Sequence, residues 1–185
     1  VYAGYAMANL DFGAFAVTAG VRVERTEVDI TGYRLPTGGT TPVAATGGGN
    51  YTNVLPSIVL RAQPQDDVIL RAAYSRSVGR PAYNQLSPGG SVNVVEESAS
   101  FGNPDLKPYV SDNVDVSAEW YFAPGGLLSL GVFAKFIKDP IFSATATLTN
   151  VDFNGTVIPR LEVSQPQNAE QGDIIGLEAA YQQQF

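Results

Sequence analysis

The feature that most constrains this chain is an alternation of apolar and polar residues that recurs in segment after segment. Between Val110 and Phe122 the even positions are apolar except for Asp112, and the odd positions are polar. Successive side chains of a β-strand point to opposite faces, so this period of two predicts a strand with one apolar and one polar face. The same pattern recurs at 15–24, 53–63, 68–77, 128–136 and 175–185, and weakly at 1–10. We therefore expect about seven strands.

The lengths of these segments and of their connections favour a membrane-spanning sheet. Many segments run to at least ten residues, and a strand needs about 9–11 residues to cross a bilayer at a tilt. Short connections at 10–13, 64–67 and 123–126 alternate with long ones near 32–50, 79–109 and 138–171. This order puts all long connections at one end, as in outer-membrane barrels with long extracellular loops. The predicted fold class is all-β: an antiparallel up-and-down meander, part of a large transmembrane β-barrel that seven strands leave incomplete.

Composition excludes several classes of function. The chain has no Cys and no His, which removes disulfides, thiol nucleophiles, the Ser-His-Asp constellation and most metal sites. A net charge of −7 argues against binding to nucleic acid, which requires a basic surface. We expect no catalytic residues, no metal and no cofactor, and hence no enzyme. The chain begins and ends within strand-like patterns, so we also expect a fragment of a longer protein.

Several short motifs resemble the barrel of the TonB-dependent receptors. They are Asn-Val-Leu-Pro-Ser-Ile at 53–58, Arg-Ala-Ala-Tyr-Ser-Arg-Ser at 71–77 with Arg-Pro at 80–81, Gly-Asn-Pro-Asp-Leu-Lys-Pro-Tyr at 102–109, Asp-Val-Ser-Ala-Glu-Trp-Tyr at 115–121 and Ile-Ile-Gly-Leu-Glu at 174–178. The element at 102–109, directly before a strand, is the most specific. The resemblance covers 50–185 well and 1–30 loosely.

The resemblance implies an energised transporter in the outer membrane of a Gram-negative bacterium. Such a receptor has a 22-stranded barrel, an N-terminal plug domain and an inner-membrane energy-coupling protein as partner. The plug and the final strands are expected outside residues 1–185. The ligand would be a scarce siderophore, vitamin or carbohydrate, and the fragment alone is not expected to transport it. Alone, it is expected to self-associate through its sheet edges. The alternative is a soluble secreted all-β module that binds carbohydrate or another ligand, because alternation does not distinguish lipid from a protein core.

Two groups of candidate site residues follow from this interpretation. Charged residues on the polar faces are expected to line the barrel lumen, mainly as ion pairs: Arg22, Arg61, Arg71, Asp115, Glu119, Lys135 and Glu178. Aromatic residues in the long connections are weak candidates for ligand contact: Tyr83, Phe101, Tyr109, Phe142 and Phe153. The prolines and Asn/Asp residues of 102–109 favour a shaped transition from loop to strand over a ligand contact. Arg80-Pro81 is interpreted as a loop anchor.

Overall fold

The computed structural model describes residues 1–34, 43–153 and 155–184, and most of these residues are in β-strands. In chain order the elements are β1 (Tyr2–Asp11), β2 (Phe15–Arg34), β3 (Val43–Gln65), β4 (Val68–Gly79), α1 (Tyr83–Leu86), β5 (Gly90–Asn93), β6 (Ser98–Phe101), β7 (Tyr109–Ala123), β8 (Gly126–Lys138), β9 (Ile141–Phe153), β10 (Thr156–Asn168) and β11 (Gln171–Gln182). Within the described ranges, no helix has the length and apolarity to cross a membrane.

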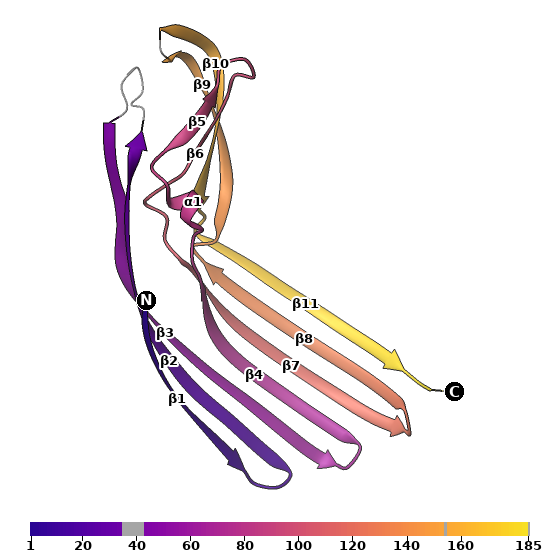
Figure 1. Ribbon diagram of the computed structural model, residues 1–185. Coiled ribbons are helices and arrows are strands. Elements are labelled where there is room, and N and C mark those ends of the chain that lie inside the picture. The colour runs from indigo at the N-terminus through magenta and orange to yellow at the C-terminus, as the bar shows by residue number, and fades with distance from the viewer. Residues whose placement is uncertain (35–42, 154, 185) are drawn as a thin grey trace.

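Seven strands form one curved sheet, which we call the wall (Figure 1). Its order is β1-β2-β3-β4-β7-β8-β11, and every neighbouring pair is antiparallel. This confirms the predicted antiparallel meander of about seven strands. The sheet is open, since β1 and β11 lie at opposite edges and do not pair with each other (Figure 1).

The strand register gives the wall two chemically different faces, as the alternation predicts. One row of laterally paired residues crosses six strands and is entirely apolar: Val17, Leu60, Ala72, Val116, Val132 and Leu177. The neighbouring row, on the opposite face, holds Ala16, Arg61, Arg71, Ser117, Gly131 and Glu178. A shift of one residue in any strand would exchange its two faces, so the hydrophobic pattern fixes the register.

The apolar face of the wall has no protein cover among the described residues. Val116 is 48 % exposed and Leu177 is 73 % exposed. The buried hydrophobic residues in the described ranges all lie in the connections rather than in the wall: Leu86, Ala99, Leu106, Ile158 and Leu161. The wall therefore has no hydrophobic core of its own, and burial of its apolar face requires an apolar environment from outside the chain.

The short connections are tight turns at one end of the wall (Figure 1). Gly13 has φ +77°, and its N–H donates to Asp11 Oδ1 at 2.9 Å. Gly125 has φ +73°. These left-handed conformations suit glycine because it lacks a Cβ atom. The two glycines therefore allow the tight turns predicted at 10–13 and 123–126.

The long connections at the other end contain more regular structure than the sequence interpretation gave them. Strands β2 and β3 remain paired through 32–34 and 43–50, and residues 35–42 lie outside the described residues. The segment 79–109 contains α1, β5 and β6, and 138–171 is mostly the β9–β10 hairpin. The physical reason is visible in β9, where Thr145, Thr147 and Thr149 alternate with apolar residues and favour a strand.

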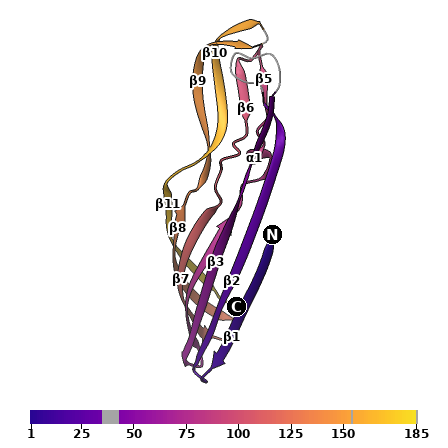
Figure 2. The ribbon, with the colours of Figure 1, turned by 90° about the vertical axis from the view of Figure 1, so that its left-hand side faces the viewer.

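The connections 79–109 and 138–171 build a second sheet beyond the end of the wall (Figure 2). Its order is β5-β6-β10-β9, with a parallel pair between β6 and β10 in which Ala99 is the partner of Val163. Ala99, Ile158 and Leu161 form its buried core, against which Phe101 and Phe153 pack. Two connections about 60 residues apart therefore share one hydrophobic core.

Candidate functional site

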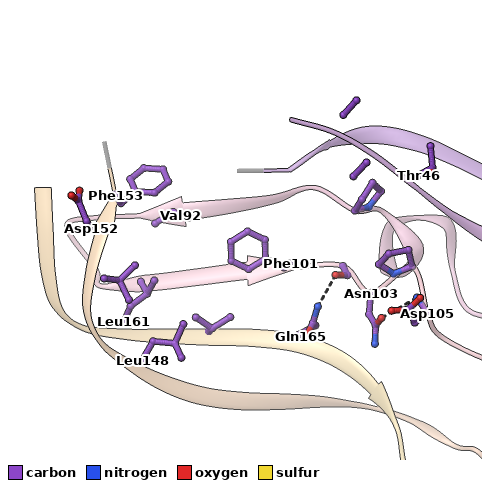
Figure 3. A pocket seen from close by; sticks show the side chains of 17 residues that line it. Thr46, Val92, Phe101, Asn103, Asp105, Leu148, Asp152, Phe153, Leu161 and Gln165 are labelled. Atoms are coloured by element: carbon purple, nitrogen blue, oxygen red, sulfur yellow. Dashed lines mark hydrogen bonds between the residues drawn. The ribbon is translucent and has the colours of Figure 1, made fainter. Parts of the chain in front are cut away.

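A pocket of about 690 Å³ lies between the second sheet and the adjoining end of β3 (Figure 3). Its volume falls within the roughly 300–1,000 Å³ of typical small-molecule sites. The second sheet contributes the apolar side of the pocket, made of Val92, Phe101, Leu148, Val151, Phe153, Leu161 and Val163. The remaining lining is Ala44, Ala45, Thr46, Pro88, Gly102, Asn103, Pro104, Asp105, Asp152 and Gln165. The pocket thus combines an apolar side with a small set of polar groups.

The motif at 102–109 forms one corner of this pocket. Asn103 Oδ1 accepts a hydrogen bond from the backbone N–H of Asp105 at 3.0 Å, which shapes the local turn. Asn103 Nδ2 donates to the carbonyl oxygen of Pro166 at 3.0 Å, so the same side chain reaches β10. The transition from loop to strand predicted at 102–109 is present, and Asn103, Pro104 and Asp105 also line the cavity.

The motif packs tightly against the wall at Gly47. A Cβ atom placed on Gly47 would lie 2.1 Å from the Cβ atom of Pro104, so no larger residue fits without movement. This contact holds the second sheet close to β3 and closes that side of the pocket.

Polar side chains of β10 connect the segments 79–109 and 138–171 to each other through hydrogen bonds. We call these contacts the clasp. Gln165 Nε2 donates to the carbonyl oxygen of Gly102 at 2.9 Å (Figure 3). Asn168 Oδ1 accepts from the N–H of Lys107 at 2.9 Å, and Asn168 Nδ2 donates to the Lys107 carbonyl oxygen at 3.0 Å. Asn168 Nδ2 also donates to the Asp139 carbonyl oxygen at 2.7 Å. Asn168 therefore connects its own strand, β10, with the backbone at Lys107 and at Asp139.

The five candidate aromatic residues separate into two groups. Phe101 and Phe153 line the pocket. Tyr83 is 84 % exposed on α1, Phe142 is 47 % exposed on β9, and neither lines it. Tyr109 also lies outside the lining, and its ring fills the space over Gly79.

The sequence interpretation missed Thr46, Leu148, Leu161 and Gln165 as pocket residues. The alternation of Leu161, Val163 and Gln165 along β10 is a signal that could have revealed one side of the cavity. Leu148 and Thr46 lie in segments interpreted as loops, where no face was assigned.

The seven residues predicted to line a lumen all lie on the polar face of the wall, as the register rows show. Glu119 forms an ion pair with Arg71, and Arg61 Nη2 donates to Gln63 Oε1 at 2.6 Å. Arg22 pairs with Glu24. Asp115, Lys135 and Glu178 form no ion pair with any residue in the described part of the chain.

Arg80 links the connection 79–109 to the polar face. Its guanidinium pairs with Glu24, and its Nε lies 3.3 Å from Thr26 Oγ1. Glu24 is only 8 % exposed, and it also pairs with Arg22. Because β3 lies between β2 and β4, Arg80 reaches across one strand as the chain leaves β4. This geometry matches the interpretation of Arg80-Pro81 as a loop anchor.

Polar and aromatic side chains bound the apolar face of the wall at both ends. Near the long connections, Asp112 accepts hydrogen bonds from Arg76 Nε and Nη2, both at 2.8 Å, and from Tyr74 at 2.6 Å. Near the short turns, the Phe122 ring lies 5.7 Å from the Trp120 ring and 5.8 Å from that of Tyr181, between centroids.

The distance between these two boundaries can be estimated along β7. Ten residues separate Asp112 from Phe122, which is about 33 Å of strand. A strand tilted by about 40° then covers about 25 Å, the height of the apolar band of outer-membrane barrels. An open, two-faced antiparallel wall with this band and with long connections at one end defines a segment of a large transmembrane β-barrel.

The comparison with family models identifies the particular family. The model described as TonB-dependent receptor-like, beta-barrel matches residues 1–185, and the chain belongs to this family. This agrees with the resemblance in the sequence motifs. No curated protein matches the chain.

Solved structures of this class share the fold at low sequence identity. A double mutant of the Serratia marcescens hemophore receptor HasR, in complex with its hemophore HasA and heme, has a TM-score of 0.72 and 16% identity, over 97% of this chain and 31% of that one. The siderophore receptor PirA from Pseudomonas aeruginosa has a TM-score of 0.67 and 17% identity, over 96% and 30%. A ferric enterobactin receptor mutant from Pseudomonas aeruginosa, in complex with enterobactin, has a TM-score of 0.65 and 19% identity, over 96% and 24%. The chain thus spans about a quarter to a third of the length of these receptors.

Proposed function

We propose that this chain is a wall segment of an outer-membrane receptor of a Gram-negative bacterium that takes up a scarce ligand with energy from the inner membrane. The observation that carries the proposal is the strand register. It gives an uncovered apolar face and a charged opposite face across the six strands from β2 to β11 in the order of the wall. In this assignment the apolar face contacts lipid, and the polar face lines a lumen occupied by the plug domain. The proposal includes binding and passage of a small molecule and no catalytic step.

The proposed roles of the two ends follow from the same geometry. The short turns face the periplasm, and the second sheet with its pocket faces the outside, where the ligand arrives. The ion pairs on the polar face are suited to contact with a folded plug, because a polar interface requires complementary charges. The inner-membrane energy-coupling protein would act through segments beyond residues 1–185, so this wall segment alone does not transport.

The structures of similar receptors with heme and with enterobactin support a small-molecule ligand. Siderophores, vitamins and carbohydrates are the classes to consider. The alternative of a soluble secreted binding module is less compatible with the wall, because a water-soluble sheet would need a cover over residues such as Val116 and Leu177.

The test is site-directed labelling of the complete receptor in lipid vesicles. This chain contains no native Cys, so single Cys substitutions at 114, 115, 116 and 117 introduce unique sites within it. Spin labels at Val114 and Val116 should be accessible to oxygen, which partitions into lipid. Labels at Asp115 and Ser117 should be accessible to a water-soluble relaxation agent. Absence of this alternation would refute the proposed membrane wall.

A further inference from the structure

The polar side chains that line the pocket combine acceptors with neutral donors. Asn103 Nδ2 donates one hydrogen to Pro166 and Gln165 Nε2 donates one to Gly102, which leaves one N–H on each amide. The groups left for a ligand include the carboxylates of Asp105 and Asp152, which only accept hydrogen bonds when ionised, and the hydroxyl of Thr46. No Lys or Arg is among the described residues that line the pocket.

These acceptors lie at the two ends of an apolar surface. Figure 3 shows Asp152 near Phe153 at one end, Asn103 and Asp105 at the other, and the Phe101 ring between them. Phe101 and Phe153 pack on the core of the second sheet, so their rings are held in place. A ligand that matches this surface has C–H groups on one face and hydrogen-bond donors around its rim.

The absence of basic residues from the described lining argues against an anionic ligand. A multiply charged anion such as a tris-catecholate iron complex would approach two carboxylates with no guanidinium or ammonium group in the lining to offset the repulsion. A hydroxyl-rich ring instead brings O–H donors to the carboxylates, and hydrogen bonds to charged acceptors are the stronger kind. Its C–H face can pack on the phenyl rings.

We propose that this pocket selects an uncharged, hydroxyl-rich ligand of the saccharide class and rejects anionic iron chelates. The inference rests on the proposed function, because it assumes that the pocket lies on the ligand's path into the receptor. Phe101 and Phe153 provide the stacking surface, and Asp105 and Asp152 accept hydrogen bonds from the ligand's hydroxyl groups.

The test uses the complete receptor in detergent and two probes: a panel of neutral di- and trisaccharides, and ferric enterobactin as the anionic chelate. Binding is measured by calorimetry for the parent protein, Asp105→Asn, Asp152→Asn, the double variant and Phe101→Ala. Phe142→Ala is the matched control, since this exposed aromatic residue lies outside the pocket. Asn can still accept the hydrogen bond that Asp152 receives from the N–H of Gly155, so both Asp→Asn changes should leave the fold intact.

We expect at least one saccharide to bind, with affinity reduced about tenfold in the double variant and in Phe101→Ala and unchanged in Phe142→Ala. Ferric enterobactin should not bind the parent protein. Failure of every saccharide to bind would overturn the proposal, as would binding of ferric enterobactin to the parent protein. Equal losses in Phe142→Ala would also overturn it.

A parallel uptake experiment separates this inference from the proposed function. Cells that produce the complete receptor are tested for uptake with and without the inner-membrane energy-coupling protein. Coupling-dependent uptake of an anionic chelate, without saccharide binding, would overturn the saccharide assignment and leave the receptor function standing. Coupling-independent uptake of every ligand would instead overturn the proposed function.

Discussion

Removal of the Asn168 side chain should destabilise the connections 79–109 and 138–171 together. Asn168 makes three hydrogen bonds, two to the backbone of Lys107 and one to the carbonyl oxygen of Asp139. A hydrogen bond contributes roughly 0.5–1.5 kcal/mol net, and partly exposed bonds lie toward the low end because water replaces them. Asn168→Ala should therefore cost about 1.5–2 kcal/mol of local stability, a factor of roughly ten or more in the opening equilibrium.

Two further variants make this prediction specific. Asn168→Asp keeps the acceptor for the Lys107 N–H but replaces both donors with an oxygen that faces carbonyl groups, so its effect should be at least as large. Gln167→Ala is the matched control, because Gln167 is the preceding residue of β10, is exposed, and makes no side-chain hydrogen bond within the described ranges.

The measurement is hydrogen–deuterium exchange of the complete receptor in detergent. In Asn168→Ala the amides of 98–108 and 156–168 should exchange about tenfold faster, while β7 and β8 in the wall remain unchanged. Unchanged exchange at 98–108 would refute the idea that the clasp couples the two connections. An equal increase in Gln167→Ala would show that any change in β10 has the same effect, and it would refute the assigned role of Asn168.

Three other perturbations test the wall and its anchors. Glu24→Gln should weaken the contacts with Arg22 and Arg80 and raise the proteolysis rate of the segment after β4. The local cost should be about 1–2 kcal/mol, because both guanidinium groups are partly exposed. An unchanged proteolysis rate would contradict this. Val116→Arg should destabilise the complete barrel by about 2–4 kcal/mol in reversible folding into vesicles, and Ser117→Arg much less; equal costs would contradict the assignment of faces. Residues 1–185 alone in dilute buffer should self-associate through the edges of β1 and β11, and a strictly monomeric species in sedimentation analysis would argue against free edges.

The wall could be predicted from the sequence because its information is local. Each strand carries its own alternation, and neighbouring wall strands joined by tight turns pair in the register that the apolar residues require. Tight turns set the pairs Leu60–Ala72 and Val116–Val132 of the lateral row. The pairs Val17–Leu60, Ala72–Val116 and Val132–Leu177 join strands linked by long connections, and there the apolar pattern limits the register.

The second sheet could not be predicted in the same way, because the pair that joins its two hairpins, β6 with β10, is not local. The partnership of Ala99 with Val163 joins residues 64 positions apart, and nothing in either short segment specifies the other. The pocket could not be predicted for the same reason. Phe101 and Phe153 were recognised as loop aromatics, but the cavity between them depends on strands that sequence periodicity assigned to loops.

The parallel pairing of β6 with β10 has a consequence for the exchange of specificity between relatives. A chimaera that receives only one of the two long connections would inherit half of a hydrophobic core and half of a set of backbone hydrogen bonds. Transplantation should therefore succeed only when 80–108 and 139–170 are taken from the same donor. In natural descent, substitutions in these two stretches should accumulate together, while the intervening strands β7 and β8 can drift on their own.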